Sequence, residues 1–324
     1  MKEYNKMKQN KKAFTLIEMI FTLIILSILS IGTFISIKHL YQRVAKSRAI
    51  SDLSSNSQVI VDEISSLLYD RVPTSVIGYN PADNNFKSIY QLQGNFHILE
   101  WIGTATEALK KRDYSGFIDM DGSNKIDNIV KSFGVNKSGI NEILKNKFGG
   151  NNNIANAGVA LIFSGTFDEG VIGSDFNNSF GWHGYKHNLV YDINITDNNI
   201  SFGTVRPDEI YEKYYLVDSA YAIARGADIN QNAACIKAFN FLKANSKDIN
   251  NTLFLFYNFR PWKDETFCAD PNSAGEGNVT ILSSEVSGFE SGLINNSIYF
   301  ELTLQRNIRG TDNNVTISKQ KVVF

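Results

Sequence analysis

Apolar residues follow three different patterns along this chain. An unbroken apolar run extends from Phe14 to Ile37. The next apolar residues recur at helical spacing before Pro73, at Leu53, Ile60, Ile64 and Leu67. Beyond them, apolar and polar residues alternate in short stretches, which is typical of strands with one buried face. The patterns predict one long N-terminal helix packed on an antiparallel sheet, an α+β fold.

The first run is long enough to cross a membrane. As a helix, residues 14–37 would extend about 36 Å at about 1.5 Å per residue, against a bilayer core of about 30 Å. Its polar side chains are mostly hydroxyls, which can bond to carbonyls of their own helix. Glu18 is its single charge and costs about 2.5–3.5 kcal/mol in such a position unless it has a partner.

A new amino terminus would supply that partner. If the chain is cut between Ala13 and Phe14, the α-amine of Phe14 stands four residues before Glu18, on the same helix face. In a medium of low dielectric constant, the amine and the carboxylate would neutralise each other, within one chain or between neighbouring chains.

The order of these features resembles a known family. Lys11-Lys12-Ala13 followed by Phe-Thr-Leu-Ile-Glu and an apolar helix is similar to the class III leader of type IV pilins and type II secretion pseudopilins. The resemblance implies that a prepilin peptidase cuts before Phe14 and methylates its amine, and that Glu18 guides entry into a filament. The family usually has Gly before the cut, where this chain has Ala13. An ordinary secretory signal cut near Gly32, or an uncleaved anchor, would leave Glu18 unexplained.

The expected organisation follows from this resemblance. Residues 1–13 form the leader, residues 14–72 the helix, and residues 73–324 a β-rich domain with a helical insertion at 104–150. Later strands resemble the minor pseudopilin of the J class and the W-type minor pilin. The implied partners are the prepilin peptidase, other pilins or pseudopilins and an inner-membrane assembly platform.

Charge is distributed unevenly between the leader and the rest. The whole chain has a net charge of −1, and residues 1–13 hold five Lys and one Glu, so the remainder carries −1 − 4 = −5. The basic leader favours a single-pass topology in the cytoplasmic membrane, with the C-terminal domain in the periplasm. An acidic domain gives no electrostatic indication of nucleic-acid binding.

Several local structures are expected within the C-terminal domain. Residues 74–96 read as loop, and residues 232–245 as a short helix. The stretch from Tyr214 to Arg225 reads as a tight hairpin turning at Asp218-Ser219. Strands are expected at 97–103, 159–164, 188–196, 200–205, 252–258, 279–284, 297–306 and 315–324.

The two cysteines, Cys235 and Cys268, suit one disulfide outside the cytoplasm. By closing a loop of the chain, this disulfide would stabilise the fold by roughly 3–4 kcal/mol on the chain-entropy model. The alternative is two unpaired thiols. Their spacing matches no redox or zinc motif.

Alternating acidic residues suggest a calcium loop at Asp119, Asp121 and Asp127. The match is partial, because a full loop needs Gly at its sixth position and an acid at its twelfth, where this chain has Asn124 and Val130. An acidic turn between helices is the competing interpretation. With calcium, the protein would instead be an adhesin on the filament.

Enzyme motifs are absent from the sequence. It has no Gly-x-Ser-x-Gly and no phosphate or dinucleotide loop. His183 and His187 are four apart, but the glycines around them favour a surface loop over a metal-binding helix. The expectation is a structural subunit without catalysis or required cofactor. The alternative is a periplasmic binding module or enzyme that uses the helix only as an anchor.

Overall fold

The computed structural model describes residues 15–81, 85–91, 95–124, 128–164, 176–230, 233–239, 241–244, 248–268, 274–308 and 314–324. The chain divides into two compact units. The first comprises Met1–Asp52 and Arg306–Val315, and the second Leu53–Gln305 and Thr316–Phe324. The α+β class expected from the sequence is confirmed, because one long helix precedes a domain made mainly of antiparallel strands.

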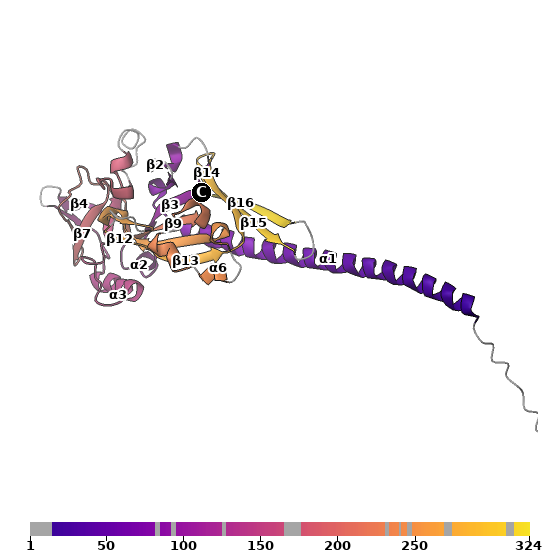
Figure 1. The fold of residues 1–324 in the computed structure, drawn as a ribbon. Coiled ribbons are helices and arrows are strands. Elements are labelled where there is room, and N and C mark those ends of the chain that lie inside the picture. Colours follow the sequence, from indigo (N-terminus) through magenta and orange to yellow (C-terminus); the bar gives the residue numbers. More distant parts are fainter. Residues whose placement is uncertain are drawn as a thin grey trace, which may run out of the picture. The chain divides into compact units, whose positions relative to one another are not determined.

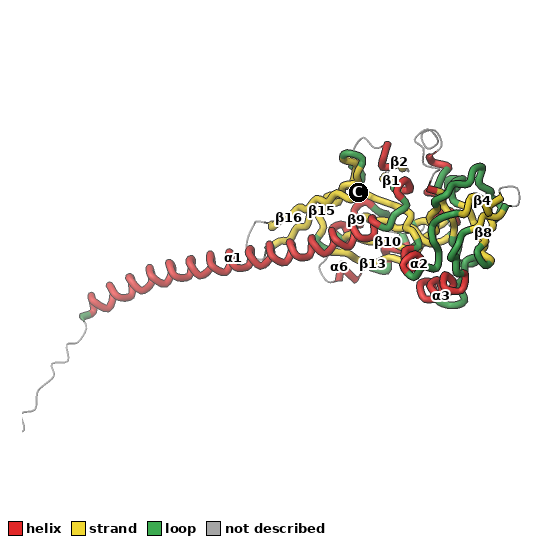
Figure 2. The backbone as a smooth tube through the Cα atoms, turned by 180° about the vertical axis from the view of Figure 1, so that it is seen from behind, coloured by secondary structure: helices red, strands yellow, loops and turns green. Residues whose placement is uncertain are grey.

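Helix α1, Leu16–Tyr69, is continuous over 54 residues (Figure 2). Its second half buries a stripe at helical spacing, formed by Leu53, Ser57, Ile60, Val61, Ile64 and Leu68. Leu68 takes the last buried position, where the sequence predicted Leu67. Lys319 fastens this half to the domain by donating from Nζ to Ser54 O at 3.0 Å and to Gln58 Oε1 at 2.9 Å.

The other α-helices of the described residues are short. They are α2 (Thr106–Lys110), α3 (Lys137–Phe148), α5 (Ala234–Lys237) and α6 (Phe241–Ala244). The Asn136 side chain caps α3 by accepting from Gly139 N at 3.2 Å. The insertion expected to be helical contains α2 and α3, and also two strands.

Strands form the bulk of the second unit. They are β1 (Ile77–Asn80), β2 (Asn85–Ser88), β3 (Ile98–Thr104), β4 (Asp119–Asn124), β5 (Ile129–Lys131), β6 (Ala160–Phe163), β7 (Tyr191–Thr196), β8 (Asn199–Phe202), β9 (Tyr214–Arg225), β10 (Leu253–Phe259), β11 (Glu265–Thr266), β12 (Gly275–Glu276), β13 (Asn278–Ser283), β14 (Val286–Ile294), β15 (Ser297–Asn307) and β16 (Asn314–Val323). The segment expected to be loop at 74–96 thus contains β1 and β2.

The main sheet is antiparallel and branches at β9. Its strand order is β2-β1-β3-β9-β6-β7-β8-β5-β4, and β10 and β13 continue from β9 as a branch. Figure 1 labels β3, β9 and β13 of this sheet. The first part of β9 pairs with β6, from Tyr214 to Val217, and the second part pairs with β10, from Ala220 to Arg225. On its other side β9 pairs with β3. A second sheet has the order β14-β15-β16.

The hairpin predicted at Asp218-Ser219 is wrong. One strand runs through this point, and Asp218 is an extra residue in it, because Gly103 pairs with Ser219 while Thr104 pairs with Val217. The bulge reverses the alternation of side chains. Leu216 faces a core shared with α2 and α3, whereas Val217 and the alanines beyond the bulge face a second core built on β3 and β10. The break in the apolar pattern at Asp218-Ser219, which reads as a turn in the sequence, is therefore the point where the register of β9 changes.

A disulfide joins Cys235 to Cys268, whose Cα atoms are 5.7 Å apart and 33 positions apart in sequence. Cys235 is buried on α5, and Cys268 packs against the core built on β3 and β10. The bond ties the short helices to the segment that follows β10. Trp182 and Trp262 are buried in the same core.

Candidate functional site

The first half of α1 exposes apolar side chains around its whole circumference. Within the first unit, the large side chains from Leu16 to Ile37 are between 47% and 80% exposed. The helix is long enough and apolar enough to cross a membrane. A surface of this kind is unstable in water, so a membrane or other apolar helices must cover it.

The hydroxyls within this segment bond to carbonyls of their own helix. The donor–acceptor pairs, with distances of 2.7–2.9 Å, are Thr22 to Met19, Ser27 to Leu23, Ser30 to Leu26, Thr33 to Ser30 and Ser36 to Gly32. Each of these five hydroxyls, which would be costly in a lipid core without a partner, is therefore satisfied within the helix.

Glu18 lies in the first turn of α1 and interacts with Thr15, the residue just before the helix. Thr15 N and Thr15 Oγ1 both donate to Glu18 Oε2, and Glu18 N donates to Thr15 Oγ1, each at 3.4 Å. These reciprocal contacts form a capping box, with the hydroxyl residue at the N-cap and the acid three positions later. The negative charge also lies at the positive end of the helix dipole.

Sequence reasoning assigned a role to Glu18 but missed Thr15. The signal was present, because Thr-x-x-Glu before an apolar run is the pattern of a capping box. Ala13 and Phe14, the residues expected at the cut, lie outside the described residues. The geometry around Glu18 is therefore that of a carboxylate held at the start of the helix, four residues after Phe14 in sequence.

The expected calcium loop lies on the β4–β5 hairpin. Asp119 Oδ1 accepts from Gly122 N at 3.2 Å, and its Oδ2 is 3.8 Å from Lys131 Nζ. Asp121 is exposed on β4, and Asp127 lies outside the described residues. Across the described ranges, no group of three His, Cys, Asp or Glu residues is placed to hold a metal ion. Asp119 and Asp121 stand on a strand, where the sequence suggested a turn.

The two histidines of the Trp-His-Gly-Tyr-Lys-His stretch bond to different groups. His183 Nε2 is 2.9 Å from Glu100 Oε1, and its ring stacks on Tyr79 with centroids 3.9 Å apart. The His183 side chain is only 9% exposed, so the surface loop expected there is wrong for this residue. His187 Nδ1 lies 3.2 Å from Val190 O. His183 packs the loop on the sheet through Glu100.

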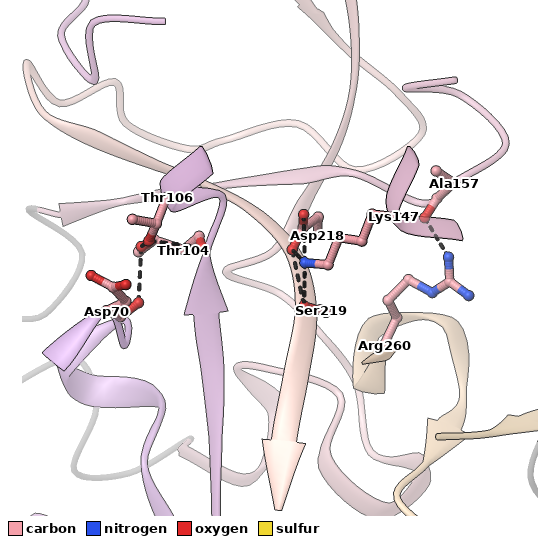
Figure 3. Close-up of polar contacts among 8 residues, drawn as sticks. All are labelled: Asp70, Thr104, Thr106, Lys147, Ala157, Asp218, Ser219 and Arg260. Carbon is pink, nitrogen blue, oxygen red and sulfur yellow. Dashed lines mark hydrogen bonds and ion pairs between the residues drawn. The ribbon is translucent and has the colours of Figure 1, made fainter. Parts of the chain in front are cut away.

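A buried ion pair occupies the bulge of β9 (Figure 3). Lys147 Nζ, from α3, lies 2.9 Å from both carboxylate oxygens of Asp218 and 3.1 Å from Ser219 Oγ. Burial works to lower the pKa of Lys147, but the Asp218 carboxylate and smaller contributions outweigh it, so this pKa is raised. Lys147 is therefore an ammonium donor. It is not a base for the Ser219 hydroxyl, which is fully buried.

The sheet branch next to this pair is held by further polar contacts. Arg260 Nη1 donates to Ala157 O (Figure 3). Trp262 Nε1 donates to Gly158 O at 2.9 Å. Beside Lys147 and Asp218 lies a cavity of about 230 Å³, which is below the usual size of small-molecule sites, about 300–1,000 Å³. The arrangement is suited to joining α3, β6 and β10 to β9.

Comparison with known proteins gives one match. A family model, the prokaryotic N-terminal methylation motif, matches residues 8–34. No curated protein and no solved structure matches the chain. The matched residues include the last six residues of the expected leader, 8–13, together with the expected cut and Glu18. This match and the long apolar helix support a pilin-like protein that is cleaved, methylated and anchored in a membrane.

Proposed function

We propose that this chain, which carries the prokaryotic N-terminal methylation motif and fits the type IV pilin and pseudopilin family, is a minor subunit of a secretion pseudopilus or type IV pilus. It serves protein secretion, pilus biogenesis or DNA uptake through assembly. The observation that carries this function is the first half of α1, which is apolar on every side and has one carboxylate in its first turn.

The processed chain begins at Phe14. A prepilin peptidase removes residues 1–13, whose lysines keep the leader on the cytoplasmic side. The C-terminal domain stands in the periplasm, and an inner-membrane platform moves the subunit from the membrane into the filament. There the exposed side chains of α1 pack against helices of other subunits, which replace lipid around them.

Glu18 makes this transfer specific. The capping box fixes the carboxylate at the start of the helix, where cleavage creates the Phe14 amine. A neighbouring subunit's amine neutralises Glu18, because a carboxylate and an ammonium attract strongly where water is excluded. A subunit in the wrong axial position would leave both charges unpaired.

The first experiment is the intact mass of the protein from membranes that contain prepilin peptidase. Residues 14–324 plus one methyl group is the expected mass. A full-length mass, or a cut near Gly32, would instead support a periplasmic binding module or enzyme that is only anchored or secreted.

Assembly itself is tested with Glu18→Ala. Filament incorporation, measured by shearing and immunoblotting, should fall at least about tenfold while the protein remains in the membrane. The matched control is Glu63→Ala, which removes an exposed glutamate from the second half of the same helix. Equal incorporation of Glu18→Ala and the unaltered protein would rule out the proposed role of Glu18.

A further inference from the structure

A cavity of about 630 Å³ lies in the second unit, where the start of β3 pairs with the end of β9. Its walls come from the end of β1, from residues 95–97 just before β3 and from residues 227–230 just after β9. The volume is within the usual range of small-molecule sites, about 300–1,000 Å³. None of the described lining residues belongs to the first half of α1 or to the Lys147–Asp218 pair, so neither feature accounts for this cavity.

Two aromatic rings of the wall, Tyr79 and Phe96, are held in place by neighbours. The Tyr79 ring stacks on His183 with centroids 3.9 Å apart. Phe96 lies against Gly78 of β1, where any Cβ atom would clash with the ring, so only glycine allows this close approach. Rings fixed in this way offer apolar surface to a ligand at little cost in conformational entropy.

Asp228 supplies the one carboxylate among the lining residues that the structure describes. Arg225 Nε donates to its Oδ2 at 3.0 Å, and Arg225 Nη2 donates to its Oδ1 at 3.5 Å. The ion pair neutralises the charge, which removes most of the attraction for a cationic ligand. Because a carboxylate can accept about four hydrogen bonds, Asp228 can still accept from hydroxyls of an uncharged ligand.

Two more polar side chains of the wall, His97 and Asn95, are oriented by the second sheet. His97 Nδ1 donates to Phe289 O at 3.2 Å, so Nε2 of the neutral ring is an acceptor for a ligand. Asn95 Nδ2 donates to Glu290 Oε2 at 2.7 Å, and Tyr299 Oη donates to Asn95 Oδ1. An amide nitrogen has two hydrogens, so Asn95 can donate once more.

The cavity therefore combines fixed aromatic rings with neutralised or uncharged polar groups. A purely apolar ligand would leave those polar groups unpaired, which is costly. We propose that this cavity binds a neutral saccharide. The C–H face of the sugar packs on Tyr79 and Phe96, while its hydroxyls donate to Asp228 and His97 and accept from Asn95. This inference goes beyond the proposed function, because it holds whether or not the chain enters a filament.

The test uses the full chain in micelles of a detergent without a sugar head group, since such a head group could itself occupy the cavity. Glucose, galactose, mannose and N-acetylglucosamine are each added at about 10 mM, and binding is measured by saturation-transfer NMR. At least one sugar should bind with a Kd of about 1 mM, whereas choline and inorganic phosphate, the charged probes, should not. The absence of binding by all four sugars, or equally strong binding of a charged probe, would overturn the proposal.

Two pairs of substitutions locate the site. His97→Ala removes an acceptor and should weaken sugar binding about tenfold. His187→Ala is its matched control, because His187 Nδ1 also lies 3.2 Å from a carbonyl oxygen, that of Val190, but His187 is not part of the cavity wall. Ala227→Trp fills part of the cavity and should abolish binding, whereas Ala155→Trp, at an exposed alanine elsewhere, should leave it unchanged.

Urea unfolding of each variant checks that the domain is folded. Sugar binding that survives Ala227→Trp in a folded variant would contradict the assignment to this cavity. Equal losses in both members of either pair would contradict it as well.

Discussion

The two halves of α1 contain similar apolar residues in opposite surroundings. In the first half Phe21 is 60% exposed and Ile31 62%, whereas Leu53 and Ile64 in the second half are fully buried. The first half is apolar on all sides, and the second has one apolar stripe with polar residues around it. The distribution of apolar residues thus distinguishes a helix surrounded by lipid or other helices from one that lies on a protein core.

The carboxylate in the first half of α1 also differs from the carboxylate buried in the domain. Glu18 is exposed and caps its own helix, whereas Asp218 is 5% exposed in its side chain and is neutralised by Lys147. A charge in the domain's interior needs a fixed partner in the same chain, whereas the proposed function requires Glu18 to exchange its partner on assembly. Variants of each region should therefore affect different properties.

The largest effect is expected from Asp218→Asn. It leaves the Lys147 ammonium facing a neutral amide and should lower the free energy of unfolding by about 3 kcal/mol. Urea unfolding in detergent, followed by tryptophan fluorescence, measures it. Glu18→Gln is the matched control and should not change the domain's unfolding. Adding Lys147→Met to Asp218→Asn should recover part of the loss; a single variant with unchanged stability would contradict the role of the pair.

Ile64→Ala should lower the free energy of unfolding by nearly as much. It removes a fully buried side chain from the stripe and should lower the free energy of unfolding by about 2–3 kcal/mol through lost burial and a cavity. Ile24→Ala, in the first half where Ile24 is 51% exposed, should leave this free energy unchanged. Equal effects of the two substitutions in urea unfolding would mean that the two halves do not differ as described.

High pH should also lower the stability of the domain, without acting on the first half of α1. Burial raises the pKa of Tyr214 to about 12, and hydrogen bonds from Ser132 and Gly116 only partly offset it. The folded state holds the phenol proton more tightly than the unfolded state. Its contribution of about 2 kcal/mol is thus complete below pH 10 and is lost between pH 10 and 12. In the Tyr214→Phe variant, the free energy of unfolding measured with urea should fall less steeply between pH 10 and 12. An unchanged slope would assign the loss to other groups.

Much of the fold followed from periodicity. The long helix was predictable from the continuous run and the stripe, and β15 from the strict alternation of Ile298, Phe300, Leu302 and Leu304. These patterns are local and are set by the face that each element buries. The pair Cys235–Cys268 was predictable as a possibility, because two cysteines allow only one bond.

The errors arose where distant segments determine the local structure. Asp218-Ser219 reads as a turn, but it is a bulge that Lys147 stabilises from 71 residues away. Likewise, His183 lies in a glycine-rich stretch, and only its contact with Glu100 on β3 explains its burial. The capping role of Thr15 could have been predicted from the local sequence, whereas the bulge depends on the tertiary contact with Lys147.

The smallest effect is expected at the start of α1. Thr15→Val removes the hydroxyl of the capping box and should destabilise the first turn by about 1 kcal/mol, seen as faster hydrogen exchange near Glu18. Thr22→Val is the control, because the Thr22 hydroxyl only bonds back to Met19 O. Since Thr15 positions Glu18 without carrying its charge, Thr15→Val should reduce filament incorporation less than Glu18→Ala. If the two reductions are equal, orientation of the carboxylate matters as much as its charge.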